Sequence, residues 1–276
     1  MPASPSNADT PPLSVRYGQW AIVAGASEGL GAAFAEQLAA RGVHCHLVAR
    51  REALIAALAA DLRTRYGVQT AYQVLDLERV DAAEALDRAT AMHDVGLVVY
   101  NAGADDSAVK FLAQPLEKCR SLVRRNVITL METVHRFGER MARNRRGAFI
   151  LIGSDAALGG GSRVCMYTAT KGFGINFAES LWAELKPLGI DVLHLVIGAI
   201  DTPVLRRSLQ DHGIPVESVQ PAVPAELARL LLDNIANGPD LIYWPHDRDG
   251  ARELENRRRD RVLETGEILK AFWGPE

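Results

Sequence analysis

Short runs of apolar, often β-branched residues alternate along the chain with longer segments in which apolar residues recur every three or four positions. The first run, 20–24, leads through a glycine-rich segment into a helical pattern that includes Ala33, Phe34 and Leu38. Continuous short apolar runs are typical of buried parallel strands, and the three-to-four spacing is typical of amphipathic helices. The pattern predicts strands at 20–24, 44–49, 69–75, 95–100, 147–153, 190–197 and 240–244, and helices at 30–41, 51–65, 78–91, 117–143, 166–186 and 224–237.

Regular alternation of strand and helix predicts an α/β fold, a single-domain Rossmann fold with a doubly wound parallel sheet and helices on both faces. We expect this domain to span residues 17–245, since 276 residues with 48% hydrophobic content suffice for one large core. Residues 1–16 are rich in proline and polar side chains, which predicts a disordered tail. Residues 246–276 are expected to form a charged helical extension, either solvated or covering a substrate mouth.

The glycine-rich segment after the first strand has the spacing Gly-x-x-x-Gly-x-Gly. Glycines allow a backbone to approach a pyrophosphate closely, and the N–H groups at a helix N-terminus attract its negative charge. This predicts a dinucleotide-binding loop, although a glycine turn that only packs tightly remains the alternative. The cofactor-binding residues expected here are Gly25, Ser27, Glu28, Gly29, Leu30 and Gly31.

Two arginines, Arg50 and Arg51, follow the second predicted strand, where no carboxylate lies at positions 48–51. A carboxylate at this point usually accepts a hydrogen bond from the ribose 2′-hydroxyl of NAD(H), whereas guanidinium groups suit a 2′-phosphate. The sequence therefore favours NADP(H) over NAD(H). A solvated pair of charges at the start of the next helix is the alternative.

Tyr167 and Lys171 are four residues apart, just over one helical turn, and so project from the same helix face. A free tyrosine has a pKa of about 10, and a nearby ammonium favours its phenolate form. The pair thus predicts a tyrosine that exchanges a proton with a substrate. Ser154, thirteen residues before Tyr167, can donate a hydrogen bond to a substrate oxygen.

Together these motifs resemble the short-chain dehydrogenase/reductase family from about Tyr17 to Trp244. The segments Tyr17–Ala21 and Arg65–Val68 are further similar to its branch of 17β-hydroxysteroid dehydrogenases and long-chain 3-oxoacyl reductases. The resemblance implies a catalytic set in which Asn126 holds a water that connects Lys171 to solvent, and Lys171 also binds the nicotinamide ribose. Without the resemblance, Asn126 could equally be a capping or helix-kinking residue. The implied catalytic residues are Asn126, Ser154, Tyr167 and Lys171.

The same resemblance assigns Asp76 to the adenine amino group and Asn101 to the strand end beside the cofactor. The family usually has Pro-Gly after the sixth strand, but Ile197 precedes Gly198 here, which predicts looser positioning of the nicotinamide. The further cofactor-binding residues expected on this basis are Asp76, Leu77, Asn101, Ala102, Gly103, Tyr167, Lys171, Gly198, Ile200 and Thr202.

The implied function is interconversion of a ketone and a secondary alcohol with NADP(H), on an apolar substrate lying between 156–164 and a lid at 204–223. A catalytically silent NADP(H)-binding sensor is the alternative, although such a protein has no need of Ser154, Tyr167 and Lys171 together. A steroid, an acyl thioester and an aromatic ketone are the substrate classes that the sequence leaves open.

A net charge of −3 gives no indication of a nucleic-acid partner. Three scattered cysteines, with no signal peptide or long apolar run, predict a cytoplasmic protein without a transmembrane segment. His44 and His46 lie on one strand without further ligands, so we expect no metal. Apolar stripes on the helices at 117–143 and 166–186 predict a homodimer or homotetramer, unless the stripes are wholly intramolecular.

Overall fold

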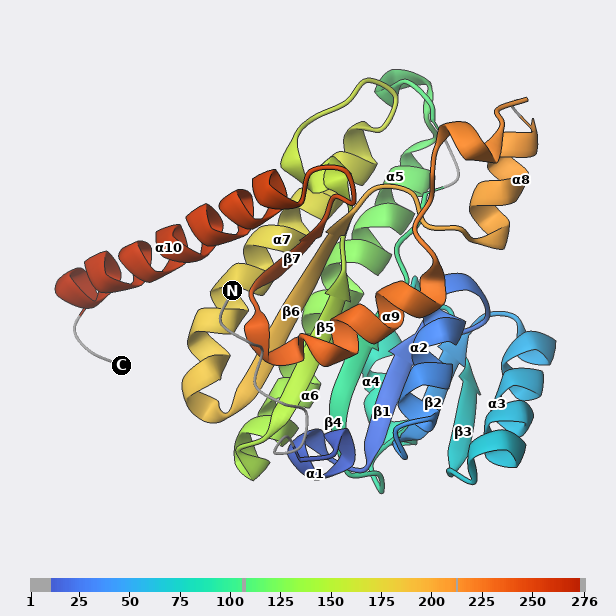
Figure 1. Ribbon diagram of the computed structural model, residues 1–276, viewed down its shortest axis with the longest axis vertical. Helices are drawn as coiled ribbons and strands as arrows, with labels where there is room; N and C mark the ends of the chain where they lie inside the picture. The colour runs from blue at the N-terminus through green and yellow to red at the C-terminus, as the bar shows by residue number, and fades with distance from the viewer. Residues whose placement is uncertain (1–10, 106–107, 212, 274–276) are drawn as a thin grey trace.

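A computed structural model describes residues 11–105, 108–211 and 213–273. Its centre is one parallel sheet of seven strands in the order β3-β2-β1-β4-β5-β6-β7 (Figure 1). The order reverses direction between β1 and β4, as in the Rossmann architecture, so the predicted fold class is confirmed. The strands are β1 (Trp20–Ala24), β2 (His44–Ala49), β3 (Thr70–Val74), β4 (Val95–Tyr100), β5 (Gly147–Ile152), β6 (Ile190–Ile197) and β7 (Asp240–Tyr243).

Helices cover both faces of the sheet, because each strand of the parallel sheet needs a crossover to reach the next. One face carries α2 (Gly29–Ala39), α3 (Glu52–Tyr66) and α9 (Pro224–Asp233), and the other carries α4 (Ala82–Ala89), α6 (Thr129–Asn144) and α7 (Cys165–Leu185). The remaining α-helices are α1 (Leu13–Tyr17), α5 (Leu116–Val123), α8 (Pro203–Asp211) and α10 (Arg248–Trp273).

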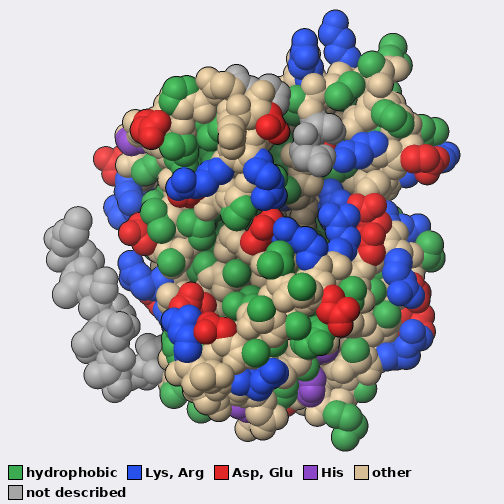
Figure 2. Space-filling view, turned by 90° about the vertical axis from the view of Figure 1, so that its right-hand side faces the viewer, with side chains coloured by type: hydrophobic (Ala, Val, Ile, Leu, Met, Phe, Trp, Pro, Cys, Tyr) green, Lys and Arg blue, Asp and Glu red, His purple; other side chains and the backbone are tan. Residues whose placement is uncertain are grey.

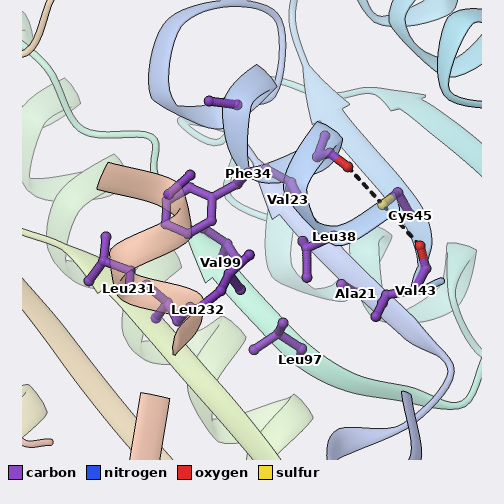
Figure 3. Packing of buried hydrophobic residues seen from close by; sticks show 14 of the residues in the cluster. Ala21, Val23, Phe34, Leu38, Val43, Cys45, Leu97, Val99, Leu231 and Leu232 are labelled. Carbon is purple, nitrogen blue, oxygen red and sulfur yellow. Dashed lines mark hydrogen bonds between the residues drawn. The ribbon is translucent and has the colours of Figure 1, made fainter. Parts of the chain in front are cut away.

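Strand β1 divides its side chains between two buried clusters with the period of two that a strand imposes. Ala21 and Val23 join the cluster under α2 and α9, whereas Ile22 packs on the opposite side. Figure 3 shows the first cluster, in which Phe34 of α2 packs against the sheet. Phe34 has no exposed surface, and full burial of such a side chain contributes about 1.5–3 kcal/mol.

The N-terminal segment departs from the prediction of a disordered tail over 1–16. Helix α1 begins at Leu13, and its last residue, Tyr17, is buried and donates a 2.7 Å hydrogen bond to Asp191 on β6. A Cβ at Gly96 would lie 1.1 Å from the Tyr17 carbonyl oxygen, so the glycine lets this segment pack directly on β4. The prediction was therefore wrong for residues 13–16, while residues 1–10 lie outside the described residues.

The C-terminal extension is helical, as predicted, and α10 runs along α7 before projecting away from the body (Figure 1). Its first turns contact β7 through Glu255, whose carboxylate accepts a 2.6 Å hydrogen bond from the Ile242 backbone N–H. In the described part of the chain, no helix combines the length and apolar character needed to cross a membrane.

Candidate active site

The proposed site residues come together at the carboxyl ends of the central strands. Asn101 follows β4, Ser154 follows β5 and Gly198 follows β6, and parallel strands end at one edge of the sheet. Tyr167 and Lys171 reach this edge from the first turns of α7. The edge beside the reversal of strand order is where open α/β sheets bind ligands, as the sequence predicted.

The glycine loop has a geometry that larger residues could not adopt. A Cβ at Gly31 would lie 2.0 Å from the Gly25 carbonyl oxygen, and Gly25 itself has a φ of +84°. The Asn101 side-chain amide donates a 3.0 Å hydrogen bond to the same Gly25 carbonyl, which ties the loop to β4. Because α2 begins at Gly29, its first N–H groups are available to an anion. The cradle therefore fits a pyrophosphate.

Thr202 joins the loop to the segment after β6. A Cβ at Gly29 would lie 2.8 Å from the Thr202 side chain, so the two predicted cofactor segments are in contact. Ile200 pairs with Ala222, and the Asp201 N–H donates a 2.9 Å hydrogen bond to the Ala222 carbonyl. Ile197, where the family usually has proline, fills the core with only 2% of its surface exposed.

The two arginines after β2 have different surroundings. Arg51 forms an ion pair with Glu28 at 2.8 Å and donates a 2.7 Å hydrogen bond to Ser27. Arg207 of α8 approaches the same carboxylate at 3.7 Å. Arg50 is exposed. In the side view of the molecule, Lys and Arg side chains alternate with carboxylates across the middle of the face (Figure 2). Arg50 is therefore the arginine more available to a ligand.

Asp76 and Leu77 follow β3 in a tight turn. The Asp76 carboxylate accepts a 3.0 Å hydrogen bond from the Glu78 N–H, and the side chain is half-buried. The Leu77 side chain is buried in the core, and its carbonyl accepts a 2.8 Å hydrogen bond from Thr129. Ala102, two residues after the end of β4, is half-buried, and its backbone nitrogen lies 3.0 Å from the position of a Cβ at Gly25.

Tyr167 and Ser154 form a hydrogen-bonded pair. Burial raises the pKa of Tyr167, and the hydrogen bond with Ser154 acts in the opposite direction with a smaller effect. The Ser154 oxygen also accepts a 3.2 Å hydrogen bond from the Ala156 N–H, which fixes its position at the start of a 3₁₀ turn, η3 (Asp155–Leu158). Burial thus favours the protonated form of the phenol.

Lys171 lies beneath the phenol and is 8% exposed. Its Nζ donates a 2.9 Å hydrogen bond to the Ile152 carbonyl and lies 5.7 Å from the centre of the Tyr167 ring. Burial, with a further contribution from Arg125, lowers the pKa of Lys171 to about 8. The sequence-based expectation that Lys171 brings the pKa of Tyr167 below that of free tyrosine was wrong for this structure, because burial of the phenol dominates.

Asn126 lies in a single π-helical turn, η2 (Arg124–Ile128), between α5 and α6. Its Nδ2 donates to the Gly103 carbonyl at 3.3 Å and to the Thr170 hydroxyl at 3.1 Å. A Cβ at Gly103 would lie 3.1 Å from both Asn126 Oδ1 and Lys171 Nζ. Because glycine has no Cβ, both atoms can approach the backbone at this position closely. Such π turns occur frequently at functional sites.

Sequence reasoning missed several side chains that support this group. Thr170 holds Asn126, and the hydroxyl of Tyr100 donates a 2.7 Å hydrogen bond to the Arg125 carbonyl in the π turn. Thr170 could have been found, because it lies one turn after Tyr167 and beside Lys171. His194 on β6, which also borders Lys171, carried no motif that would have indicated it.

Residues 19–213 match the family model described as short chain dehydrogenase. The chain belongs to the short-chain dehydrogenase/reductase family, and it is therefore an oxidoreductase of the dehydrogenase and reductase type. The predicted resemblance is confirmed.

Two curated relatives belong to the branches that the sequence indicated. The chain is 33% identical to a 7β-hydroxysteroid dehydrogenase of Collinsella aerofaciens over 197 residues, which cover 71% of this chain and 74% of the relative. It is 35% identical to a very-long-chain 3-oxoacyl-CoA reductase of Laccaria bicolor over 66% of this chain, but spans only 55% of that relative.

Among solved structures, a short-chain dehydrogenase from Sphingobium yanoikuyae in complex with NADPH superposes with a TM-score of 0.77 at 28% identity. The match covers 89% of this chain and 95% of that one. The similarity thus extends well beyond the segment 19–213 that matches the family model.

Proposed function

We propose that the protein is an NADP(H)-dependent oxidoreductase that interconverts a ketone and a secondary alcohol on an apolar substrate. The observation that carries the proposal is the convergence of Tyr167, Ser154, Lys171 and Asn126 at one edge of the sheet. The glycine loop after β1, which would bind the cofactor, lies across the reversal of strand order from these residues. A binding protein without turnover would not need a buried tyrosine paired with serine and lysine.

The residues that would hold the cofactor fall into three groups. Gly25, Gly29 and Gly31 would accept the pyrophosphate, since any side chain at Gly31 would collide with the backbone. Arg50 would bind a 2′-phosphate, and Asp76 with Leu77 would border the adenine. When bound, NADP(H) supplies or accepts the hydride. Gly103, Ile200 and Thr202, together with Lys171, would border the nicotinamide half.

Tyr167 would supply the proton for reduction and remove it for oxidation. Its raised pKa keeps the phenol protonated at neutral pH, the form that a general acid needs. Ser154 would donate a hydrogen bond to the substrate oxygen and stabilise the developing negative charge. Lys171, anchored on the Ile152 carbonyl, would orient both the ribose and the phenol.

Exposed apolar side chains support the choice of an apolar substrate. Phe111 and Leu112 follow β4 and are 48% and 96% exposed, and Leu158 and Val204 are more than a third exposed. Their segments lie at the same end of the molecule as the carboxyl edge of the sheet (Figure 1).

Replacement of Tyr167 with phenylalanine tests the proposal. The Tyr167→Phe change keeps the ring and removes the exchangeable proton, so kcat for ketone reduction should fall by about 10²–10⁴-fold. NADPH affinity should change little. The measurement is ketone-dependent loss of NADPH absorbance across a panel of steroid, acyl thioester and aromatic ketones.

Tyr66→Phe is the matched control, because Tyr66 lies at the end of α3 and its hydroxyl bonds to Glu36. It should keep full turnover. Near-wild-type turnover by Tyr167→Phe with a confirmed substrate would show that this phenol does not transfer the proton. Failure of the wild-type protein to oxidise NADPH with any ketone would favour the silent sensor.

Cofactor preference is tested at Arg50. Charge-assisted hydrogen bonds contribute roughly 1.5–3 kcal/mol each, so Arg50→Ala should weaken NADPH by about ten- to more than a hundredfold and leave NADH almost unchanged. Parallel fluorescence titrations with both cofactors measure the difference. Arg88→Ala on α4, an exposed arginine elsewhere, is the control. Tighter binding of NADH than NADPH by the wild-type protein would contradict the assignment.

A further inference from the structure

A chain of buried polar side chains runs from beneath Lys171 to the C-terminal helix. His194 on β6 is 1% exposed, and its Nδ1 lies 3.2 Å from Oδ1 of Asp240 on β7, which is 4% exposed. Buried polar groups are costly without partners, so this pair must be explained by its contacts.

Asp240 determines which nitrogen of His194 carries the proton. A carboxylate accepts hydrogen bonds, so Nδ1–H donates to Asp240 and Nε2 keeps a lone pair. Burial lowers the pKa of His194 to about 3, with Lys171 acting in the same direction, so the ring is neutral at physiological pH. Nε2 has no hydrogen-bond partner among the residues that the structure describes.

His194 helps to line a small cavity next to Lys171 and Asn126. This cavity has a volume of about 20 Å³, and its polar lining includes Lys171, Asn126 and Thr170. Asn126 Oδ1 is also without a hydrogen-bond partner in the described part of the chain. A water needs roughly 10–15 Å³ and two to four polar partners, and both conditions are met here.

Close packing keeps the imidazole at this position. A Cβ at Gly153, the residue before Ser154, would lie 2.3 Å from His194 Nε2, and one at Gly174 would lie 3.7 Å away. The ring therefore lies directly under the backbone that carries Ser154. It also lies beside the helix that carries Lys171, which donates to the carbonyl just before Gly153.

We propose that His194 is a positioning residue for the Tyr167–Lys171 pair: its Nε2 accepts a hydrogen bond from a water in this cavity, and the same water contacts Lys171 and Asn126. The inference rests on the proposed function of Lys171. The family resemblance already implies that Asn126 holds such a water, and the inference adds His194 as a second group that holds it.

The outer end of the chain involves α10. Arg258 donates a 2.6 Å hydrogen bond to Glu179 of α7 and lies 3.7 Å from Asp240. Burial is the largest cause that raises the pKa of Glu179 to about 7 and that of Asp240 to about 6, and in its protonated form Glu179 donates a hydrogen bond to the Asp240 carboxylate. The charged extension thus holds Asp240, and through it His194, in place.

Two substitutions at His194 separate the roles of its nitrogens. His194→Asn keeps a donor near the position of Nδ1, for Asp240, and removes the acceptor at Nε2. His194→Gln places an amide near the position of Nε2. Loss of a hydrogen-bond acceptor next to the Lys171 ammonium disfavours its charged form. The alkaline limb of kcat should therefore move to lower pH, by about one pH unit, in His194→Asn.

The titratable and charged groups around Lys171 set the alkaline limb of the pH profile. They are Tyr167 on the same helix, Arg125 on the π turn and neutral His194 on β6, with Asp240, Glu179 and Arg258 behind His194.

kcat of His194→Asn should also fall about tenfold with little change in the KM for ketone, and His194→Gln should restore part of both effects. His46→Asn is the matched control, because His46 on β2 is 3% exposed and lies far from Lys171 in the sheet order. It should leave the pH profile unchanged.

A folded His194→Asn protein with the wild-type pH profile would overturn the inference, even if Tyr167→Phe abolishes turnover. A high-resolution crystal structure of the wild-type protein gives a test that does not depend on variant folding or on activity. A water within hydrogen-bond distance of His194 Nε2 and Lys171 Nζ is expected. A well-ordered site without that water would contradict the inference whether or not a ketone is turned over.

Discussion

At the scale of single residues, Lys171 shows how a site residue is kept at a cost to stability. Its ammonium is buried with a carbonyl and an aromatic ring as neighbours, and burial lowers its pKa to about 8 from the ordinary value near 10.5. A lysine with a depressed pKa opposes folding whenever it is protonated. A lysine that the proposed chemistry needs is therefore one that the fold would be more stable without.

The pH dependence of stability follows from this shift. Below about pH 8 Lys171 is protonated in both states, and between about 8 and 10.5 the unfolded chain binds more protons than the folded one. The free energy of unfolding of the wild type should therefore rise with pH in this window relative to Lys171→Met, by an amount on the order of 3 kcal/mol in total.

Urea unfolding of both proteins at several pH values from 7 to 10.5 measures this difference. Lys110→Met, at an exposed position after β4, is the control for removal of a lysine that is not buried. If the difference in free energy of unfolding between wild type and Lys171→Met stayed constant from pH 7 to 10.5, burial would not lower the pKa of Lys171.

At the scale of elements, the alternation of apolar runs predicted the strands well because buried parallel strands carry unbroken apolar sequence. The predicted strand 95–100 agrees with β4, and 69–75 differs from β3 by one residue at each end. The segment 1–16 was predicted less well. Tyr17 and Asp191 are far apart in sequence, and their hydrogen bond across the bottom of the sheet leaves no local pattern.

The helix predicted at 117–143 contains a feature that periodicity could not show. The structure has α5, a π turn and α6 in succession, and the extra residue in the turn aims Asn126 at Gly103. The apolar residues keep a period of about 3.6 residues on each side of the turn. One inserted residue shifts only the phase of that pattern, and a short apolar stripe does not reveal such a shift. Only the family resemblance indicated this residue.

The candidate site was predictable where chemistry leaves short motifs. Tyr167 and Lys171 share one helix, and Gly25, Gly29 and Gly31 share one loop, so the combination of these short motifs indicated the candidate site, although neither spacing alone would be specific. His194 and Asp240 come from separate strands and meet only because β6 pairs with β7. Their contact depends on register, which a single sequence does not reveal.

At the scale of the whole molecule, one sheet with two helical layers absorbs most but not all of the predicted apolar stripes. Leu122, Leu130 and Val134 are buried within the chain, whereas Phe173 and Phe177 on α7 are only half-buried and stack on each other at 5.1 Å. The remaining apolar surface on α7 is what a second copy would cover.

We therefore expect a homodimer or homotetramer. Light scattering at micromolar concentration should give a mass at least twice the 30.0 kDa of one chain. Phe177→Glu should shift the protein toward the monomer, because burial of a carboxylate in an interface is unfavourable. Leu54→Glu, at an exposed apolar position on α3, should not. A 30.0 kDa particle for the wild type would contradict this expectation.

The hydrogen bond from Ile242 to Glu255 has a further consequence for the behaviour of the protein in concentrated solution. Strand β7 is the last in the sheet, and an unpaired N–H on a terminal strand can recruit a strand from another molecule. The carboxylate on α10 occupies that donor and shields the strand from intermolecular pairing. Removing the extension would therefore leave a surface competent for ordered self-association, so a shortened protein would tend to lose its solubility before it lost its fold.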